Sequence, residues 1–351
     1  MIPSTYTVTF TLFHSDNSYH TYFILSLFHI LQIVTMSLSL DKEYAEHIAA
    51  IRTAMAAFPP LAAHDIQGRR DRLAQIVASM KPPPFPESIE RSTKTATSKD
   101  GASIPIIHVK RKDIVGPSPA VVHFHGGGLI ALNAESTIGH IAVFADACKA
   151  QFFSVDYRLA PEHPYPTPLD DAWAGLQYVI DNAEALGIDP ARIAVAGESA
   201  GGNLAAGVAI LARDRKLSPP LARQIVMFPM LDDRNKDVLG PDTPRFWDEA
   251  DTETAWKAYL GDKVGTDQVE VYAAPARLED ARGMPPLYLD VGQLDLFVKE
   301  NVEYVAKHVR AGVETEFHLF PGLPHAFGSS DPGLYASRQT GENRIRIYNQ
   351  L

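Results

Sequence analysis

Residues 194–207 read AVAGESAGGNLAAG, a stretch that places one serine, Ser199, among small residues directly after a short apolar run. Glycine loses more conformational freedom on folding than any other residue, so the three glycines at 197, 201 and 202 need a physical reason. The order of apolar run, glycine-flanked serine and helical segment indicates a strand, a sharp turn and a helix. In that context the spacing Gly-x-Ser-x-Gly is typical of the turn called a nucleophile elbow.

The sterics of such a turn explain the glycines. Ser199 has to adopt a strained backbone conformation for its Oγ to project, and side chains at Gly197 and Gly201 would collide with neighbouring backbone. Gly202 would let the following helix pack closely against a sheet. The first turn of that helix would also present unpaired N–H groups and the positive end of a helix dipole beside Ser199.

Short apolar runs and helical segments alternate along much of the chain. β-branched runs separated by helices predict an α/β protein with a mostly parallel sheet that helices cover on both faces. Right-handed crossovers would bring the carboxyl ends of the strands, and any active site, to one edge. The runs occupy residues 104–109, 120–126, 152–158, 193–197, 225–230, 286–292 and 315–322, and helical segments occupy 170–187, 201–216 and 299–312.

Two helical segments precede this alternation, at residues 42–58 and 66–80, and a proline-rich linker follows them at 81–87. A long insertion after the run at 225–230 contains an aromatic helical stretch, 245–261, which we expect to form part of a lid. The predicted organisation is an N-terminal extension of unassigned role at 1–35, a helical cap segment with its linker at 36–90, and a catalytic domain at 91–351 with a cap insertion around 232–275.

Composition restricts the function further. Against 32 Lys and Arg the chain has 42 Asp and Glu, a net charge of −10, which argues against nucleic acid or an anionic membrane as partner. The single cysteine, Cys148, rules out an intramolecular disulfide, and its helical spacing with apolar neighbours predicts buried helix packing. No Asn-x-Ser/Thr sequon occurs, so we expect a cytoplasmic protein.

The first 40 residues differ from the rest. Residues 22–34 are apolar but fall short of the roughly 20 residues that span a bilayer, so no stable membrane span is expected. No Lys or Arg precedes Lys42, whereas a secretory signal needs a basic start and a small-residue cleavage site. An interfacial anchor is an alternative, although anchors usually carry basic residues. The simpler hypothesis is that translation of the functional protein starts at Met36.

A second glycine-rich turn, HFHGGG at 123–128, also follows a predicted strand. Consecutive glycines can point backbone N–H groups at one spot, which is what an oxyanion hole requires. We therefore expect Gly127 and Gly128 to donate there alongside the amide of Ala200. A phosphate-binding turn is the alternative, but no Gly-Lys-Ser/Thr follows.

A serine nucleophile needs a general base, and that base needs an acidic residue that orients it. Among 13 histidines, His325 is distinguished by its place in the loop after the last predicted strand. The order serine, acid, histidine places the acid after a strand between Ser199 and His325, where Asp290 and Asp295 are candidates. Asp290 lies inside the strand, so we choose Asp295, which lies beyond it and would hold the tautomer of His325.

Five motifs in this order resemble the hormone-sensitive-lipase family of α/β-hydrolase carboxylesterases. They are HGGG at 125–128, DYRLAPEHPYP at 156–166, GESAGG at 197–202, LD at 294–295 and PHAF at 324–327. The resemblance covers roughly residues 40–351 and implies a catalytic triad of Ser199, Asp295 and His325. It also implies that residues 156–166 form a structural loop beneath the site and that Glu198 is structural. Leu296 and Ala326 depart from the proline and glycine usual in the family, but neither change removes a functional group.

The resemblance implies a serine carboxylesterase that acts on short-to-medium acyl or aryl esters, without metal or organic cofactor. The partner is a small-molecule ester, and a homodimer is left open. Two alternatives are a hydrolase of a specific lactone or acetylated secondary metabolite, and a non-catalytic ligand receptor on the same scaffold. The receptors of that kind lack the histidine that His325 supplies here. Epoxide or haloalkane hydrolysis would need an aspartate in place of Ser199.

Overall fold

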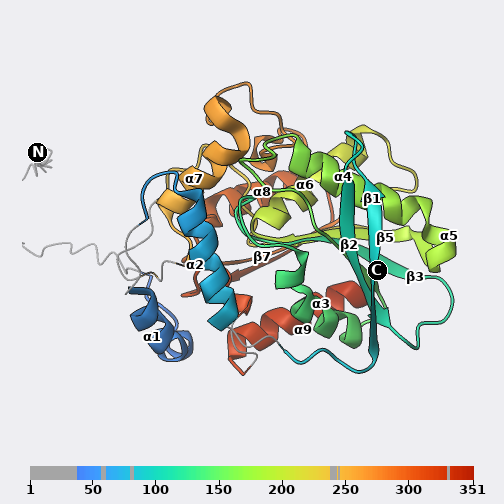
Figure 1. Ribbon diagram of the computed structural model, residues 1–351, viewed down its shortest axis with the longest axis horizontal. Coiled ribbons are helices and arrows are strands. Elements are labelled where there is room, and N and C mark those ends of the chain that lie inside the picture. Colours follow the sequence, from blue (N-terminus) through green and yellow to red (C-terminus); the bar gives the residue numbers. More distant parts are fainter. Residues whose placement is uncertain (1–37, 57–60, 80–82, 238–242, 244–245, 330–332) are drawn as a thin grey trace, which may run out of the picture. The chain divides into compact units, whose positions relative to one another are not determined.

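One eight-stranded sheet forms the centre of the protein, with the strands in the order β1-β2-β4-β3-β5-β6-β7-β8 (Figure 1). The computed structural model describes residues 38–56, 61–79, 83–237, 243, 246–329 and 333–351. The strands are β1 (Ile89–Thr97), β2 (Ser103–Arg111), β3 (Ser118–Phe124), β4 (Gln151–Val155), β5 (Ile188–Glu198), β6 (Arg223–Met227), β7 (Leu287–Gly292) and β8 (Thr315–Phe320).

The prediction of a mostly parallel sheet is confirmed. From β4 to β8 every neighbouring pair is parallel, and only β1 with β2 and β2 with β4 are antiparallel. β1 was not expected from the sequence, because as an edge strand it buries only Ile89 and Ala96 and is otherwise polar. Such a strand has neither an apolar run nor a regular alternation to reveal it.

Helices cover both faces of the sheet, as predicted (Figure 1). One face carries α3 (Ile138–Ala147) and α9 (Tyr335–Asn349), which meet where the rings of Phe144 and Tyr348 lie 5.6 Å apart. The other carries α4 (Thr167–Asp181), α6 (Ala200–Asp214) and α8 (Val298–Arg310). The remaining helical segments are α1 (Lys42–Ala56), α2 (Ile66–Ser79), α5 (Ala183–Leu186), α7 (Glu249–Leu260) and short 3₁₀ turns at Ala134–Ser136, Gly261–Lys263, Pro275–Arg277 and Phe327–Ser329.

α6 is the most deeply buried helix that bears on the site. Every residue from Ala200 to Ala212 is buried, and most of them are alanine or glycine. A Cβ added to Gly207 would lie 2.5 Å from the carbonyl oxygen of Tyr272, so the small side chains allow a close approach of backbone on this side. Because it is enclosed from its first residue to Ala212, α6 holds its N-terminus, and therefore Ser199, in one position.

Two predictions made from the sequence have direct outcomes in the fold. Cys148 ends α3 and is buried, and burial raises the pKa of its thiol to about 11, so the thiol is unreactive at neutral pH. In the part of the chain that the structure describes, no helix is both long and apolar enough to cross a bilayer. The apolar segment at 22–34 and the proposed start at Met36 lie outside the described residues.

Three buried histidines predict how stability depends on pH. Burial lowers the pKa of His108, His125 and His308 to about 4 each, against about 6.5 in an unfolded chain. Between these values the unfolded chain binds a proton at each site that the folded protein does not bind. The contribution of these histidines to the free energy of unfolding is therefore greatest above about pH 6.5. It decreases as the pH is lowered towards 4.

Urea unfolding between pH 7 and pH 4 measures this slope. His308 hydrogen-bonds through Nδ1 to the carbonyl oxygen of Tyr304, a contact that the amide of His308→Asn can replace. We expect that variant to reduce the slope of unfolding free energy against pH by about one proton. An unchanged slope would contradict the assignment of a neutral buried imidazole at this position.

Candidate active site

Ser199 lies in the turn between β5 and α6 and has the backbone angles φ 53° and ψ −115°. A non-glycine residue in this left-handed region is strained, and the surrounding structure has to impose the conformation. A Cβ on Gly197 would lie 2.2 Å from the carbonyl oxygen of Gly201, and one on Gly201 would lie 2.0 Å from that of Phe124. The close approaches expected from the sequence are therefore present, and they let the turn lie against the end of β3.

Three of the predicted residues come together at the carboxyl edge of the sheet. His325 follows β8 and places its Nε2 3.0 Å from the Oγ of Ser199. Its Nδ1 lies 2.8 Å from Oδ2 of Asp295, which follows β7. Asp295 is buried, and its Oδ1 accepts a hydrogen bond from the backbone N–H of Phe297 at 2.9 Å. An ionised carboxylate only accepts, so Nδ1 carries the proton and Nε2 is free to accept from the serine hydroxyl.

Aromatic rings fix the plane of the His325 imidazole. Phe228 and Phe297 both meet it edge to face, with ring centroids at 5.0 and 5.2 Å. Phe228 follows β6 and has φ 37°, a left-handed conformation that turns its ring towards the histidine. Sequence reasoning did not identify either phenylalanine, because single aromatic residues after strands carry no distinctive spacing.

Asp290, the acid not chosen from the sequence, has a different partner. It lies inside β7 and is fully buried, where Arg344 of α9 donates to it from Nε at 2.8 Å and from Nη2 at 2.7 Å. Tyr288 also donates its hydroxyl at 2.9 Å. These three donors occupy the carboxylate, so Asp290 joins β7 to α9 and lies apart from the hydrogen bonds of His325.

The glycine turn after β3 runs beside Ser199. Gly127 and Gly128 have φ of 117° and 64°, and the carbonyl of Gly127 accepts from the N–H of Ala131 at 3.0 Å. Within the described residues, no acceptor takes the N–H groups of Gly127, Gly128 or Ala200. The N–H groups of these two glycine-rich turns are therefore unpaired, and the turns lie close together, since a Cβ added to Gly126 would lie 3.6 Å from the Cβ of Ser199.

Residues 156–166 pack against the backbone of this turn, in keeping with the structural loop that the resemblance implies. Tyr157 donates its hydroxyl to the carbonyl oxygen of His125 at 2.7 Å, and the two rings stack with centroids 4.2 Å apart. Arg158 is held in turn by the buried carboxylate of Asp171, with its Nη2 at 2.7 Å. The loop therefore fixes the backbone that leads into Gly127 and Gly128.

Glu198 faces away from the serine into a buried polar contact. His123 of β3 places its Nε2 2.8 Å from Oε2 of Glu198 and its Nδ1 3.0 Å from the hydroxyl of Ser154. Burial would raise the pKa of the Glu198 carboxyl, but the charge and hydrogen bond of His123, with the charge of Arg344, hold it below its usual value. The carboxylate is thus ionised and occupied in linking β5 to β3.

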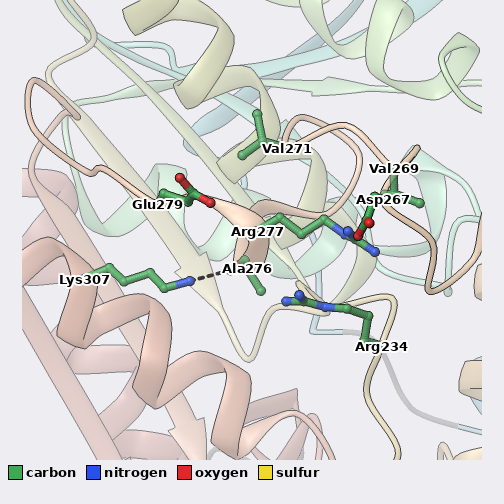
Figure 2. Close-up of a pocket in the computed structure, with 8 residues that line it drawn as sticks. All are labelled: Arg234, Asp267, Val269, Val271, Ala276, Arg277, Glu279 and Lys307. Atoms are coloured by element: carbon green, nitrogen blue, oxygen red, sulfur yellow. Dashed lines mark hydrogen bonds between the residues drawn. The ribbon is translucent and has the colours of Figure 1, made fainter.

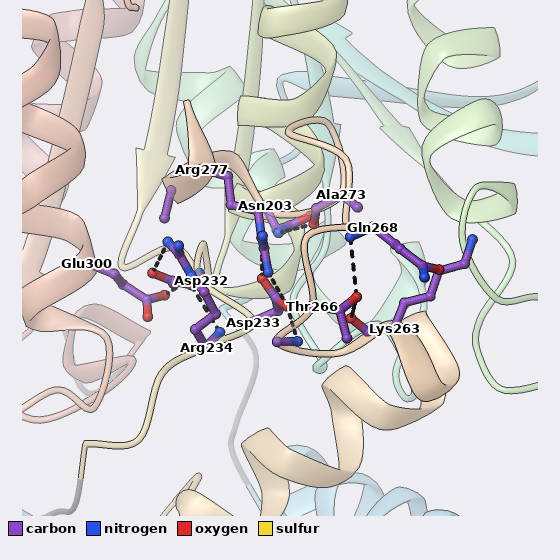
Figure 3. A network of polar contacts seen from close by, with 12 residues as sticks. Asn203, Asp232, Asp233, Arg234, Lys263, Thr266, Gln268, Ala273, Arg277 and Glu300 are labelled. Atoms are coloured by element: carbon purple, nitrogen blue, oxygen red, sulfur yellow. Dashed lines mark hydrogen bonds and ion pairs between the residues drawn. The ribbon is translucent and has the colours of Figure 1, made fainter. Parts of the chain in front are cut away.

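A polar network fixes the base of the insertion next to the site (Figure 3). Asn203 of α6 donates from Nδ2 to the carbonyl oxygens of Met230 and Ala273 at 2.9 and 3.0 Å. Asp233 is buried and accepts from Nε and Nη2 of Arg277 at 2.7 and 2.9 Å. The two ends of the insertion are therefore joined to each other and to α6.

Glu300 of α8 completes this network. Its buried carboxylate accepts from the backbone N–H groups of Leu231 and Asp232 at 2.5 and 3.2 Å, and from the side chain of Asn235 at 2.7 Å. Burial raises the pKa of Glu300 well above its usual value, and these hydrogen bonds oppose the shift.

A hollow of about 400 Å³ lies beside the network (Figure 2). Two of its arginines pair within the protein, Arg234 with Asp232 and Arg277 with Asp233, and Lys307 donates to the carbonyl of Ala276 at 2.5 Å. None of the six predicted site residues lines it, so it is separate from the candidate active site. Its lining consists of Arg234, Asp267, Val269, Val271, Ala276, Arg277, Glu279 and Lys307.

Comparison with known proteins agrees with this geometry. A family model described as the alpha/beta hydrolase fold matches residues 121–329. The chain therefore belongs to the α/β-hydrolase fold family, in its hormone-sensitive-lipase-like group, and the resemblance drawn from its motifs is confirmed.

Two curated relatives and one solved structure are esterases by name. Carboxylesterase NlhH of Mycobacterium tuberculosis is 35% identical over 276 residues, which cover 76% of this chain and 83% of the relative. Esterase LipI of the same species is 34% identical over 211 residues, covering 60% of this chain and 66% of LipI. A structure named bacterial heroin esterase has a TM-score of 0.78 at 33% identity, covering 89% of this chain and 98% of that one.

The close approach at the elbow gives a testable prediction on stability. In Gly201→Ala the new Cβ would meet the fixed carbonyl of Phe124, so we expect a loss of about 1–3 kcal/mol of unfolding free energy, together with loss of activity. Gly341 in α9 is the matched control, since a Cβ there has nothing within 4 Å. Gly341→Ala should gain about 0.5–1 kcal/mol, because alanine favours helix. Equal effects of the two substitutions in chemical unfolding would contradict the packing described.

Proposed function

We propose that this protein is a serine carboxylesterase in which Ser199 is the nucleophile, His325 the general base and acid, and Asp295 the residue that orients the imidazole. The observation that carries the proposal is the continuous hydrogen-bonded chain from Ser199 Oγ through His325 to Asp295. The esterases among its relatives support the class of reaction.

The chemistry follows from this geometry. His325 Nε2 takes the hydroxyl proton as Ser199 Oγ attacks the ester carbonyl, and Asp295 stabilises the imidazolium without taking the proton. His325 then protonates the alcohol, which leaves an acyl group on Ser199. Water then attacks the acyl carbon and gives a proton to the same Nε2. His325 returns that proton to Oγ as the acyl–Oγ bond breaks, which releases the carboxylic acid and restores the Ser199 hydroxyl.

The negative oxygen that forms in both steps needs donors already in place. We propose that the N–H groups of Gly127, Gly128 and Ala200 supply them, aided by the positive end of the α6 dipole. Loss of one such donor typically costs about 3 kcal/mol of transition-state stabilisation. The proposed reaction uses the side chains and amides of the chain itself and assigns no step to a metal or an organic cofactor.

We further propose the domain organisation expected from the sequence, with residues 36–90 and the insertion around 232–275 acting as one cap. In support, Asp251 of α7 pairs with Arg69 and Arg72 of α2, so the two segments are joined. A cap that narrows the entrance favours short-to-medium acyl or aryl esters. The ligand-receptor alternative is not favoured, because the relatives are esterases by name and His325 is hydrogen-bonded to both Ser199 and Asp295.

Replacing Asp295 or Asp290, both buried, by asparagine distinguishes a catalytic role from a structural one. Asp295→Asn should lower kcat about 10⁴-fold, because the amide stabilises the wrong tautomer of His325. Asp290→Asn should instead cost about 3–5 kcal/mol of stability, because it leaves the buried Arg344 without its counter-charge, and folded protein should retain kcat. Comparable kcat values for the two variants would overturn the assignment of Asp295.

Hydrolysis of nitrophenyl esters of increasing acyl length tests the substrate class. We expect kcat/KM to be highest between C2 and C8 and to fall for longer chains. Ser199→Ala, run alongside, should lower kcat by several orders of magnitude. Near-normal turnover by that variant would contradict the proposed function. A preference for long chains would contradict only the proposal that a cap narrows the entrance.

The remaining expectations concern partners and location. We propose a small-molecule ester as the partner and a cytoplasmic location, which the acidic charge and the cysteine content support. A homodimer stays an open proposal, which light scattering on purified protein would decide.

A further inference from the structure

Trp247, from the insertion, lies directly against one of the proposed oxyanion donors. A Cβ added to Gly128 would lie 2.2 Å from Cη2 and 2.6 Å from Cζ2 of the Trp247 indole. The ring is 6% exposed, so this contact is enclosed. The six-membered end of the indole therefore occupies the space that any side chain at residue 128 would need.

Gly128 has reason to depend on such a contact. Its φ of 64° places it in the left-handed region, and glycine is the residue with the most freedom to leave that conformation. Its N–H has no acceptor among the described residues, and the peptide that carries it is hydrogen-bonded only on its other side, where the carbonyl oxygen of Gly127 accepts from the N–H of Ala131 at 3.0 Å. The Trp247 indole, packed where a Cβ of Gly128 would lie, adds a restraint from the side that no hydrogen bond holds.

The indole is itself held firmly. Its Nε1 donates to Oγ1 of Thr252 at 2.9 Å, and that hydroxyl donates to the carbonyl of Asp248 at 3.0 Å. Asp248 caps α7, with its side chain accepting from the N–H of Asp251. The ring is thus tied to the first turn of α7.

Helix α2 connects this turn to the loop that carries Gly128. Arg69 and Arg72 both pair with Asp251. Arg70, between them, donates from Nε to the carbonyl of Ile130 at 2.7 Å, two residues beyond Gly128, and pairs with Glu162. In Figure 1, α2 lies beside α7, so neighbouring arginines of one helix bind the first turn of α7, which holds the indole, and the loop that carries Gly128.

We propose that Trp247 is a positioning residue for the oxyanion hole, which holds the Gly128 amide in the direction that the transition state needs. The inference rests on the proposed esterase function and names a residue from the insertion as a determinant of rate. Because an error of 1 Å in such a donor can cost about 10²-fold, withdrawal of the ring should lower kcat with little change in KM.

Trp247→Phe tests this with limited damage to the fold, because phenylalanine remains aromatic but is too short to reach Gly128. We expect kcat to fall about tenfold and KM to change less than twofold. The matched control is Trp256→Phe, on α7 itself. Trp256 is equally buried, and its Nε1 has no hydrogen-bond partner in the described part of the chain, so that variant loses no bond. It should stay within twofold of wild type.

A double-mutant cycle then isolates the contact. Gly128→Ala should be severely impaired, since its Cβ would collide with the indole. In the Trp247→Phe background the ring is shorter, so the same alanine should cost at least fivefold less activity. The left-handed strain of alanine is present in both backgrounds and cancels. Additive effects would overturn the proposal.

An aryl trifluoromethyl ketone distinguishes positioning from general loss of structure. Ser199 Oγ adds to its carbonyl carbon, the hydroxyl proton passes to His325, and the carbonyl oxygen becomes an oxyanion. The inhibition constant should therefore rise in Trp247→Phe by the same factor as kcat/KM falls. A rise in KM alone, or equal losses in Trp247→Phe and Trp256→Phe, would contradict the inference. Failure of the esterase proposal would look different, because wild type itself would be inactive or Ser199→Ala as active as wild type.

Discussion

The close passage of backbone at the elbow is the constraint on which the rest of the structure depends. Gly201 can lie against the carbonyl of Phe124 only because it has no side chain, and this contact brings the end of β3 up to the start of α6. The serine and the unpaired amides of the glycine turn consequently share one small space. Any additional carbon atom would force the two turns apart, and the hydroxyl and the donors would no longer face the same carbonyl. Strain at Ser199 is tolerated because α6, buried from Ala200 to Ala212, cannot move to relieve it.

Two buried carboxylates that lie close together in the chain, Asp290 and Asp295, show how the partner of an acidic residue determines its role. Asp290 faces an arginine, which stays charged at all accessible pH values, so the pair is fixed and links β7 to α9. Asp295 faces an imidazole, whose charge changes during a proton transfer, so the same carboxylate can stabilise a transient cation. Four residues of chain separate them, and the end of β7 lies between. The fold thus uses one acid for stability and the other for chemistry.

The sequence was sufficient for the parts of the fold and site that repeat a local rule. Ser199 is marked by its glycines, and Asp295 and His325 by their place after predicted strands, and the structure brings these three together. It was not sufficient for β1, whose exposed polar residues hide a strand, or for α9, whose buried face includes Ser337, Thr340 and Arg344 in place of an apolar stripe. Trp247 was missed for another reason, and so was the specific contact of Tyr157, although the motif at 156–166 that contains Tyr157 was expected to form a structural loop. Each acts through a contact with a distant glycine turn, and no spacing along one chain reveals such a contact.

The joint between α2 and α7 shows what buried charge contributes here. Burial raises the pKa of Asp251, although the Arg72 charge opposes the shift, so removing this carboxylate from water is costly. A buried ion pair of this kind adds little net stability, because desolvation offsets most of the attraction. The ion pair does make any other register of α2 and α7 less stable, since a shift would leave a buried charge unpaired. An apolar contact would tolerate sliding, whereas Asp251 with Arg69 and Arg72 admits one arrangement. That arrangement is the one in which the Trp247 indole, hydrogen-bonded to the same turn, lies against Gly128.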